Sequence, residues 1–198
     1  PHRERASYND PELREAALSR GLSPVPKTFK ALLKLVDTPN NQLTVEKIRL
    51  GKALYFDPIL SKSSDISCAT CHSFNKEGKE GSTVLLDFLL SKNNNATDCT
   101  ACHISDQSGV DRFTVAVGHE GTEDPYHLNT PTILNAALAK YFTWNGTVQS
   151  VEEQAGIDLQ SHFRMNITPK ELENRLKSSP LYAGQFEEAF SDGVSFEN

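Results

Sequence analysis

All four cysteines of the chain occur in two copies of one short pattern. Residues 68–72 read CATCH and residues 99–103 read CTACH, so each copy has two cysteines that are separated by two residues and followed directly by a histidine. This pattern is typical of covalent haem attachment, in which the two sulfurs form thioethers with the porphyrin and the histidine binds the iron as its proximal ligand. A chain with two such motifs must fold around two large, rigid and mostly apolar groups.

The alternatives to haem require other arrangements of cysteine. A disulfide framework would distribute its cysteines over the chain, and a zinc site would need cysteine or histidine ligands at other spacings. Here no cysteine is left outside the two motifs. We therefore predict two covalently bound haems c, with four attachment points and two proximal histidines: Cys68, Cys71, Cys99, Cys102, His72 and His103.

The composition suits an exported protein that binds large cofactors. Only 37% of the residues are apolar, and the apolar surface of a haem can replace missing core side chains. The formal net charge of −6 argues against nucleic acid and an anionic membrane surface as partners, and it favours a basic protein partner. No apolar run approaches the roughly 18 to 20 residues that span a bilayer. Because haem is attached to this motif outside an energy-coupling membrane, we expect a periplasmic or equivalent location. We expect Pro1 to be either a mature N-terminus left by a cleaved leader or the first ordered residue of a longer chain.

Helix signals outnumber strand signals along the chain. Capping residues, first-turn prolines and apolar periodicity predict helices over 11–20 after a cap at Asp10, over 27–36, 45–54 and 130–138, after the capping boxes at Ser150 and Thr168, and over 180–190. Residues 82–90 fit a short buried helix or a strand equally well. We predict a mainly α, cytochrome c-like haem domain with long irregular loops over residues 44–198, preceded by a helical extension over residues 1–43.

The sixth coordination position of each iron determines its chemistry. A second strong ligand gives an electron-transfer haem, whereas an open or displaceable position allows reactions with peroxide or oxygen. Because Met165 is the only methionine, at most one haem can have histidine and methionine as its ligands. The other candidates are histidines: His119, His127, His162 and, near the chain end, His2. With two irons to satisfy, we expect at least one of these histidines to bind iron.

Several longer stretches together form a family pattern. They include LGKALYFDP at 50–58, ISCATCH at 66–72, VGH at 117–119, NTPTILNAA at 129–137 and FTWNG at 142–146, with further matches up to residue 190. From about residue 44 onward the chain resembles the N-terminal half of the bacterial dihaem cytochrome c peroxidase and MauG family. The resemblance implies a periplasmic cytochrome that reduces hydrogen peroxide or oxidises a partner through haem iron, with a small cytochrome or a cupredoxin as redox partner.

The resemblance also implies roles for individual residues. His119 matches the histidine on the distal side of the N-terminal haem, which leaves the iron on activation, and Gln154 matches a glutamine of the same pocket. Trp144 matches a tryptophan that carries electrons between the haems, although a lone tryptophan more often packs in a core. Asn129 matches a residue beside a calcium ion, so calcium is a further candidate cofactor.

The second haem motif departs from the family pattern. It lies 31 residues after the first, whereas family members place it far downstream in a C-terminal domain. The simplest interpretation is an insertion over about residues 73–103 that brings an additional haem into this domain. His119 follows His103 by 16 residues, which resembles the family spacing between proximal and distal histidines, but the family-like sequence precedes His72. Which haem receives His119 stays open, and the preceding sequence favours the first.

The identity of residue 164 bears on whether the protein is a peroxidase or an electron-transfer subunit. Arg164 occupies the position of the acidic residue that would assist cleavage of the O–O bond, and an arginine cannot accept a proton near neutral pH. His162, where the family usually has proline, is an alternative base or iron ligand. Two main hypotheses follow: a peroxidase-type enzyme, which the length of the resemblance favours, and a non-catalytic multihaem electron-transfer subunit. A haem-based sensor domain is a third.

The end of the sequence bears on the partners. The chain stops at Asn198, where the family would begin a long helix that leads into its second haem domain. We expect either such a domain to follow or a partner subunit to take its place. A homodimer also stays open.

Overall fold

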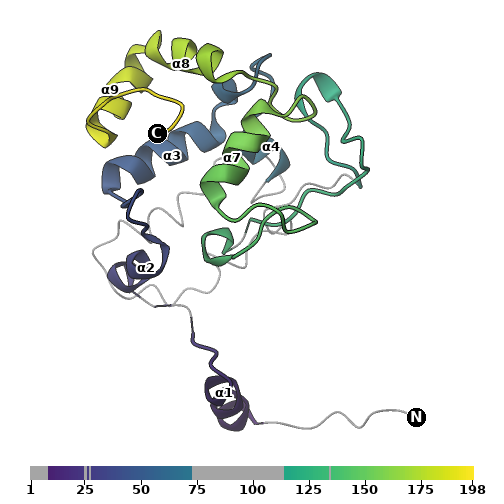
Figure 1. Cartoon of the computed structure of the whole chain (residues 1–198), viewed down its shortest axis with the longest axis vertical. Helices are drawn as coiled ribbons and strands as arrows, with labels where there is room; N and C mark the ends of the chain where they lie inside the picture. Colours follow the sequence, from purple (N-terminus) through teal and green to yellow (C-terminus); the bar gives the residue numbers. More distant parts are fainter. Residues whose placement is uncertain (1–8, 25, 27, 73–113, 134) are drawn as a thin grey trace. The chain divides into compact units, whose positions relative to one another are not determined.

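The computed structural model describes residues 9–24, 26, 28–72, 114–133 and 135–198. Several predictions lie outside these residues: the second haem motif with Cys99, Cys102 and His103, the candidate ligand His2, the element at 82–90 and the insertion at 73–103. The chain divides into two compact units, residues 1–35 and residues 36–198 (Figure 1). The helical extension over residues 1–43 stays a prediction.

The first unit contains helix α1 (Asp10–Ser19) and most of helix α2 (Phe29–Val36). Asn9 caps α1, because its side-chain oxygen accepts a hydrogen bond from the backbone N–H of Glu12 at 3.0 Å. The sequence predicts Asp10 as this cap, so the helix begins one residue earlier than expected. Gly21, with φ of +81°, follows the end of α1 as predicted.

The core of the second unit forms where three helices meet. Helix α3 (Val45–Phe56) packs against α9 (Pro180–Ala189), and α9 packs against α8 (Pro169–Lys177), as Figure 1 shows. The buried side chains come from these helices and the segments that join them: Leu50, Leu60, Met165, Ile167, Leu172, Leu176, Tyr182, Phe186 and Val194. Since burial of a large apolar side chain contributes about 1.5–3 kcal/mol, this cluster is the main source of stability for the unit.

Capping side chains fix the starts of helices in this unit. The Thr44 hydroxyl accepts the backbone N–H of Lys47 at 3.2 Å at the start of α3. Ser150 caps α7 (Val151–Gln160) and Thr168 caps α8 in the same way, at 3.0 Å and 3.3 Å. The helices predicted to begin after these three residues are confirmed, and so is the helix predicted from residue 180.

The prediction of a helix over residues 130–138 is wrong. The structure has a single 3-10 turn there, Ala136–Leu138, which follows Asn135 in a left-handed conformation with φ of +57°. The last two apolar residues of this stretch do not pack in the core, since Leu138 is 37% exposed and Ala137 is also exposed. A short helix without a buried face is marginal in water, so the local preference does not prevail.

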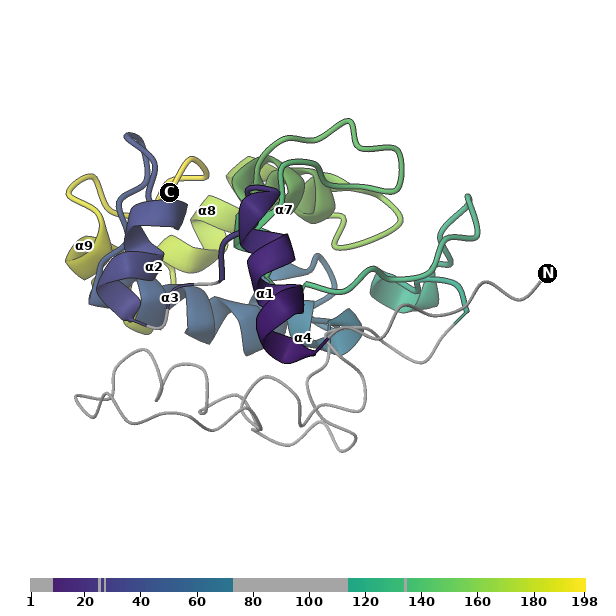
Figure 2. The same ribbon diagram turned by 90° about the horizontal axis from the view of Figure 1, so that it is seen from below.

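Loops make up most of the described chain between α4 (Cys68–Cys71) and α7. These loops are coloured teal to green in Figures 1 and 2. They contain the isolated β-bridges Val117–Glu123 and Phe142–Val148, and no strand forms over residues 114–133 and 135–150. Within the described ranges, no helix is both long and apolar enough to cross a membrane. The architecture is therefore mainly α with long irregular segments.

Candidate haem site

The first haem motif is a single helical turn. Helix α4 contains Cys68 and Cys71, and His72 follows as its C-cap, with its N–H bonded to the Cys68 carbonyl at 2.9 Å. At the other end, the Thr70 hydroxyl accepts the N–H of Ser67 at 3.0 Å, which fixes the start of the turn. Because positions i, i+3 and i+4 lie on one side of a helix, this turn brings both sulfurs and the imidazole to the same side.

The surroundings of the two cysteines suit thioethers better than metal thiolates. Both are free thiols and half-buried. Burial raises the pKa of the Cys68 thiol, which keeps its sulfur uncharged. A zinc site would need thiolates and further ligands, and the described residues contain no group of three histidine, cysteine or acidic side chains that could hold a metal ion. The first motif fits a covalently bound haem c, because its helical turn presents both sulfurs and the histidine at the spacing that haem attachment uses.

Tyr55 of helix α3 holds the backbone of His72, the predicted proximal histidine. The Tyr55 hydroxyl donates a hydrogen bond to the backbone carbonyl of His72 at 2.5 Å. Tyr55 is half-buried, and burial raises the pKa of its hydroxyl, so the group stays protonated and able to donate. Tyr55 is absent from the predicted site residues, although a partly buried tyrosine generally needs a hydrogen-bond partner and this one lies in the LGKALYFDP stretch.

A turn with a buried first residue places His119 beside the first haem motif. His119 is only 4% exposed and begins a 3-10 turn, His119–Gly121. The Cys71 sulfur lies 3.6 Å from the backbone carbonyl oxygen of Val117, so the chain just before His119 lies against the motif. The His119 N–H donates to the carbonyl of Arg164 at 2.8 Å, which fixes the turn against the segment that follows α7.

Both ring nitrogens of His119 have partners. Nε2 lies 3.0 Å from the side-chain Nδ2 of Asn166, and Nδ1 lies 3.4 Å from the hydroxyl oxygen of Ser63. Because an amide nitrogen can only donate, Nε2 is the acceptor and Nδ1 carries the proton. Nε2 therefore carries the ring lone pair, which accepts the hydrogen bond from Asn166. It is the nitrogen that can bind an iron once the amide of Asn166 turns away.

The other predicted iron ligands lie in different surroundings. The His162 ring is exposed, and its centroid lies 6.1 Å from that of His119. His127 is also exposed, in a left-handed conformation with φ of +53°. Met165 is 7% exposed and packs in the hydrophobic core. The structure thus brings His162 beside His119, and a bond between iron and Met165 would require the thioether to leave the core.

Helix α7 holds Gln154 in a cluster with a carboxylate that is absent from the predicted site residues. The side-chain amide of Gln154 donates to both carboxylate oxygens of Asp158 at 2.9 Å, one helical turn away. The guanidinium of Arg164 pairs with the same carboxylate. Among the described residues, the Oε1 atom of Gln154 is buried without a hydrogen-bond partner. The i, i+4 spacing of Gln154 and Asp158 is the sequence signal that could have indicated this contact.

Trp144 lies on the surface rather than in the core. It is 63% exposed, and its indole N–H donates to the backbone carbonyl of Asn129 at 3.0 Å. Core packing therefore does not explain this tryptophan. The contact joins two residues to which the resemblance assigns functions, and their roles in electron transfer and calcium binding stay predictions.

Known proteins match this chain over most of its length. Residues 45–87 and 81–198 match the family model of the di-haem cytochrome c peroxidases. The methylamine utilization protein MauG of Methylorubrum extorquens is 33% identical over 150 residues, which are 76% of this chain and 33% of that protein. The cytochrome c551 peroxidase of Pseudomonas aeruginosa is 30% identical over 174 residues, 86% of this chain and 41% of that protein. The chain thus spans between a third and about two fifths of the length of these relatives.

A solved structure shares the fold. The crystal structure of a MauG-like protein associated with microbial copper homeostasis is similar with a TM-score of 0.60 and 22% identity, over 81% of this chain and 39% of that one. At this identity the likeness concerns the fold alone. It confirms the predicted mainly α, cytochrome c-like architecture.

Proposed function

This chain belongs to the di-haem cytochrome c peroxidase family, and we propose that it forms the part of a periplasmic peroxidase that holds a haem with a displaceable distal histidine. The reaction is the reduction of hydrogen peroxide, or its use to oxidise a partner protein. The observation that carries the proposal is the buried His119 turn, which is joined to the first haem motif through the contact between Cys71 and Val117.

His119 is assigned to the haem of the first motif. When bound, the haem supplies an iron that exchanges electrons and offers its sixth position to a ligand. His119 Nε2 has two alternative partners, that iron and the amide of Asn166. Ser63 holds the proton on Nδ1 in either case, so the lone pair stays on Nε2. His119, Asn166 and Ser63 are thus the residues that would control whether the haem iron can take peroxide as a ligand.

Asp158 is assigned to proton transfer. Each peroxide that is reduced to water takes up a pair of protons together with a pair of electrons, and Arg164 cannot relay protons near neutral pH. The carboxylate of Asp158 can, and it is oriented by the guanidinium of Arg164 and the amide of Gln154. The side-chain amide of Gln154 holds the carboxylate of Asp158 in place through both of its oxygens.

The electrons come from outside the described site. A small cytochrome or a cupredoxin is the proposed donor, and the haem of the second motif is the proposed entry point. The exposed indole of Trp144 suits a role in electron transfer between haems, and Asn129, whose carbonyl it contacts, is the proposed neighbour of a calcium ion. A partner subunit or a further domain would cover this surface.

A multihaem electron-transfer subunit is the second candidate. The observation in its favour is the ion pair between Arg164 and Asp158, because it occupies the carboxylate that proton transfer requires. In this case both irons would keep two strong ligands, and peroxide would find no open position.

Rapid mixing with hydrogen peroxide separates the two candidates. The purified haem-loaded protein is reduced stepwise, and its absorption spectrum is followed after peroxide, cyanide or carbon monoxide is added. A peroxidase gives a high-spin haem that binds these ligands promptly, and His119→Ala gives that state without prior reduction. Two low-spin haems that bind none of the ligands at any potential would instead establish the electron-transfer subunit.

A further inference from the structure

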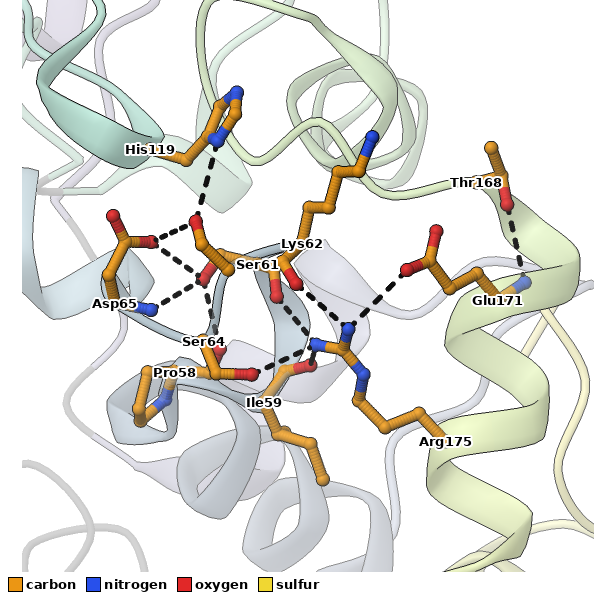
Figure 3. A network of polar contacts seen from close by, with 11 residues as sticks. Pro58, Ile59, Ser61, Lys62, Ser64, Asp65, His119, Thr168, Glu171 and Arg175 are labelled. Carbon is orange, nitrogen blue, oxygen red and sulfur yellow. Dashed lines mark hydrogen bonds and ion pairs between the residues drawn. The ribbon is translucent and has the colours of Figure 1, made fainter.

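The loop at residues 61–65 contacts the His119 turn at its backbone, through Glu120, and at the His119 ring. Figure 3 shows the contact to the ring. We propose that Asp65 is a positioning residue that locks this turn and so controls how readily His119 changes partner. The second half of this statement rests on the proposed function, whereas the first half concerns the turn alone. Asp65 acts through its neighbours and has no contact with the reacting atoms.

Asp65 uses both carboxylate oxygens. Its Oδ2 accepts the backbone N–H of Glu120 at 2.6 Å. Its Oδ1 accepts the hydroxyl of Ser63 at 2.8 Å and that of Ser61 at 3.3 Å. The Asp65 N–H in turn donates to the Ser61 hydroxyl at 3.2 Å, so the carboxylate has a defined orientation. The Glu120 N–H is the main cause that lowers the pKa of Asp65, which agrees with an ionised carboxylate in this role.

The bond to Glu120 stabilises the least favourable residue of the turn. Glu120 has φ of +54°, in the left-handed region that residues with side chains rarely adopt. Its N–H donates to a carboxylate, and such charge-assisted hydrogen bonds are stronger than those to neutral acceptors. Loss of the carboxylate would remove this contact and let the turn relax.

Ser63 connects Asp65 to the ring of His119. The Ser63 hydroxyl donates a hydrogen bond to Asp65, so its oxygen lone pairs remain free to accept the Nδ1–H of His119. The resulting chain of Asp65, Ser63 and His119 fixes the tautomer in which Nε2 carries the lone pair. The same carboxylate therefore sets the backbone conformation of the turn and the proton position on the ring.

Arg175 of α8 fixes the loop from its other side, as Figure 3 shows. Its guanidinium donates to the carbonyls of Ile59 at 2.9 Å, Ser61 at 2.6 Å and Lys62 at 3.0 Å, and to the hydroxyl of Ser64 at 3.1 Å. Because Leu172 and Leu176 of α8 belong to the core cluster, these bonds anchor the loop to the hydrophobic core. Asp65 is thus a fixed anchor against which the turn is held.

Hydrogen exchange of the haem-loaded protein tests the lock directly. Mass spectrometry follows the peptide that covers residues 117–123 in the wild type, Asp65→Ala, Asp65→Asn and the control Lys62→Gln. Lys62 takes part through its backbone only, so its exposed side chain can be changed without loss of a contact. Asp65→Ala is expected to raise the exchange rate of this peptide roughly ten- to hundredfold, the usual effect of losing a hydrogen bond to a charged group. Asp65→Asn keeps one acceptor oxygen and is expected to give a smaller rise, and Lys62→Gln none.

A spectroscopic readout tests the consequence for the histidine. The share of high-spin haem and the rate of cyanide binding are expected to rise in Asp65→Ala and to stay at the wild-type values in Lys62→Gln. Unchanged exchange in a folded Asp65→Ala protein would overturn the proposal. If that variant fails to fold, unchanged exchange in Asp65→Asn, which keeps the size of the side chain, would overturn it equally. A third outcome is faster exchange in Asp65→Ala together with a haem spectrum that neither Asp65→Ala nor His119→Ala changes. This outcome would support the lock and contradict the proposed function.

Discussion

In the proposed mechanism, peroxide reduction depends on the charges at residues 158 and 164. Since Asp158 is the carboxylate that Arg164 pairs with, Asp158→Asn should remove the proposed proton carrier while leaving an amide of the same size. We expect the rate of peroxide reduction to fall by roughly 10²–10⁴, the usual contribution of a general acid–base group. Stopped-flow mixing of the partially reduced protein with peroxide measures this rate.

Glu152→Gln is the matched control for this change. Glu152 lies on the same helix, is exposed and accepts a hydrogen bond from Asn41, which a glutamine oxygen can also accept. Its rate should equal that of the wild type. Equal rates in Asp158→Asn and Glu152→Gln would assign the proton to another group, with exposed His162 next to be tested.

Gly118 is the residue at which the His119 turn has no room for a side chain. A Cβ atom there would lie 2.1 Å from the carbonyl oxygen of Phe163 and 2.8 Å from the Cα of Arg164, and both are backbone atoms that cannot rotate away. We expect Gly118→Ala to lower the free energy of unfolding by about 1–3 kcal/mol, as overpacking generally does. Urea denaturation of the haem-loaded protein measures the change.

Gly51→Ala provides the opposite case for comparison. Gly51 lies within α3, and a Cβ there would meet no atom within 4 Å. Alanine should therefore stabilise the helix by about 0.5–1 kcal/mol. If both alanine variants had the same stability, the close approach of Gly118 to residues 163 and 164 would not exist in solution.

At the scale of elements, local signals in the sequence predict where helices begin. Tertiary contacts decide whether a predicted helix forms and which distant residues meet. The caps at Thr44, Ser150 and Thr168 are correct, because a cap joins residues only three positions apart. The helix at 130–138 is not, because its formation depends on a buried face that the fold does not provide. The same limit explains the site: the motif at 68–72 is local and readable, whereas the contact between Asp65 and Glu120 joins residues 55 positions apart. Such contacts leave no periodic signal in a sequence.

The attachment of the C-terminal segment to α8 depends on pH. Glu173 of α8 accepts the backbone N–H of Phe196 at 3.0 Å and pairs with Lys177 at 3.0 Å. The bond to Lys177, followed by that to the Phe196 N–H, lowers the pKa of Glu173 from its ordinary value of 4.5. A lowered pKa in the folded state adds stability that is present above pH 4.5 and is lost as the pH falls through the folded value.

Glu173→Gln removes this contribution. The difference in the free energy of unfolding between wild type and variant should be constant at neutral pH and should shrink below pH 4.5. Urea denaturation at a series of pH values measures it. A difference that stays constant down to pH 3 (roughly one and a half pH units below the ordinary pKa) would show that the carboxylate has the same pKa in the folded and unfolded chain.

At the scale of the whole molecule, the second haem motif is what distinguishes this chain from the pattern it otherwise follows. The chain spans a third to about two fifths of its relatives, yet it contains two complete motifs within 36 residues, from Cys68 to His103. In the proposed function, the haem of the second motif is the entry point for the electrons that reach the haem of the first.

Removal of the motifs one at a time tests the haem count and the assignment of His119 together. The wild-type chain should carry two haems c, measured by intact mass and by the pyridine haemochrome spectrum. Replacement of Cys99 and Cys102 by alanine should leave one haem whose spectrum still changes when His119 is replaced, because the carbonyl of Val117 contacts Cys71 of the first motif. Replacement of Cys68 and Cys71 should leave a haem that is insensitive to His119. The reverse result would assign His119 to the haem on residues 99–103, and the 16-residue spacing from His103 would then be the correct guide to the distal ligand.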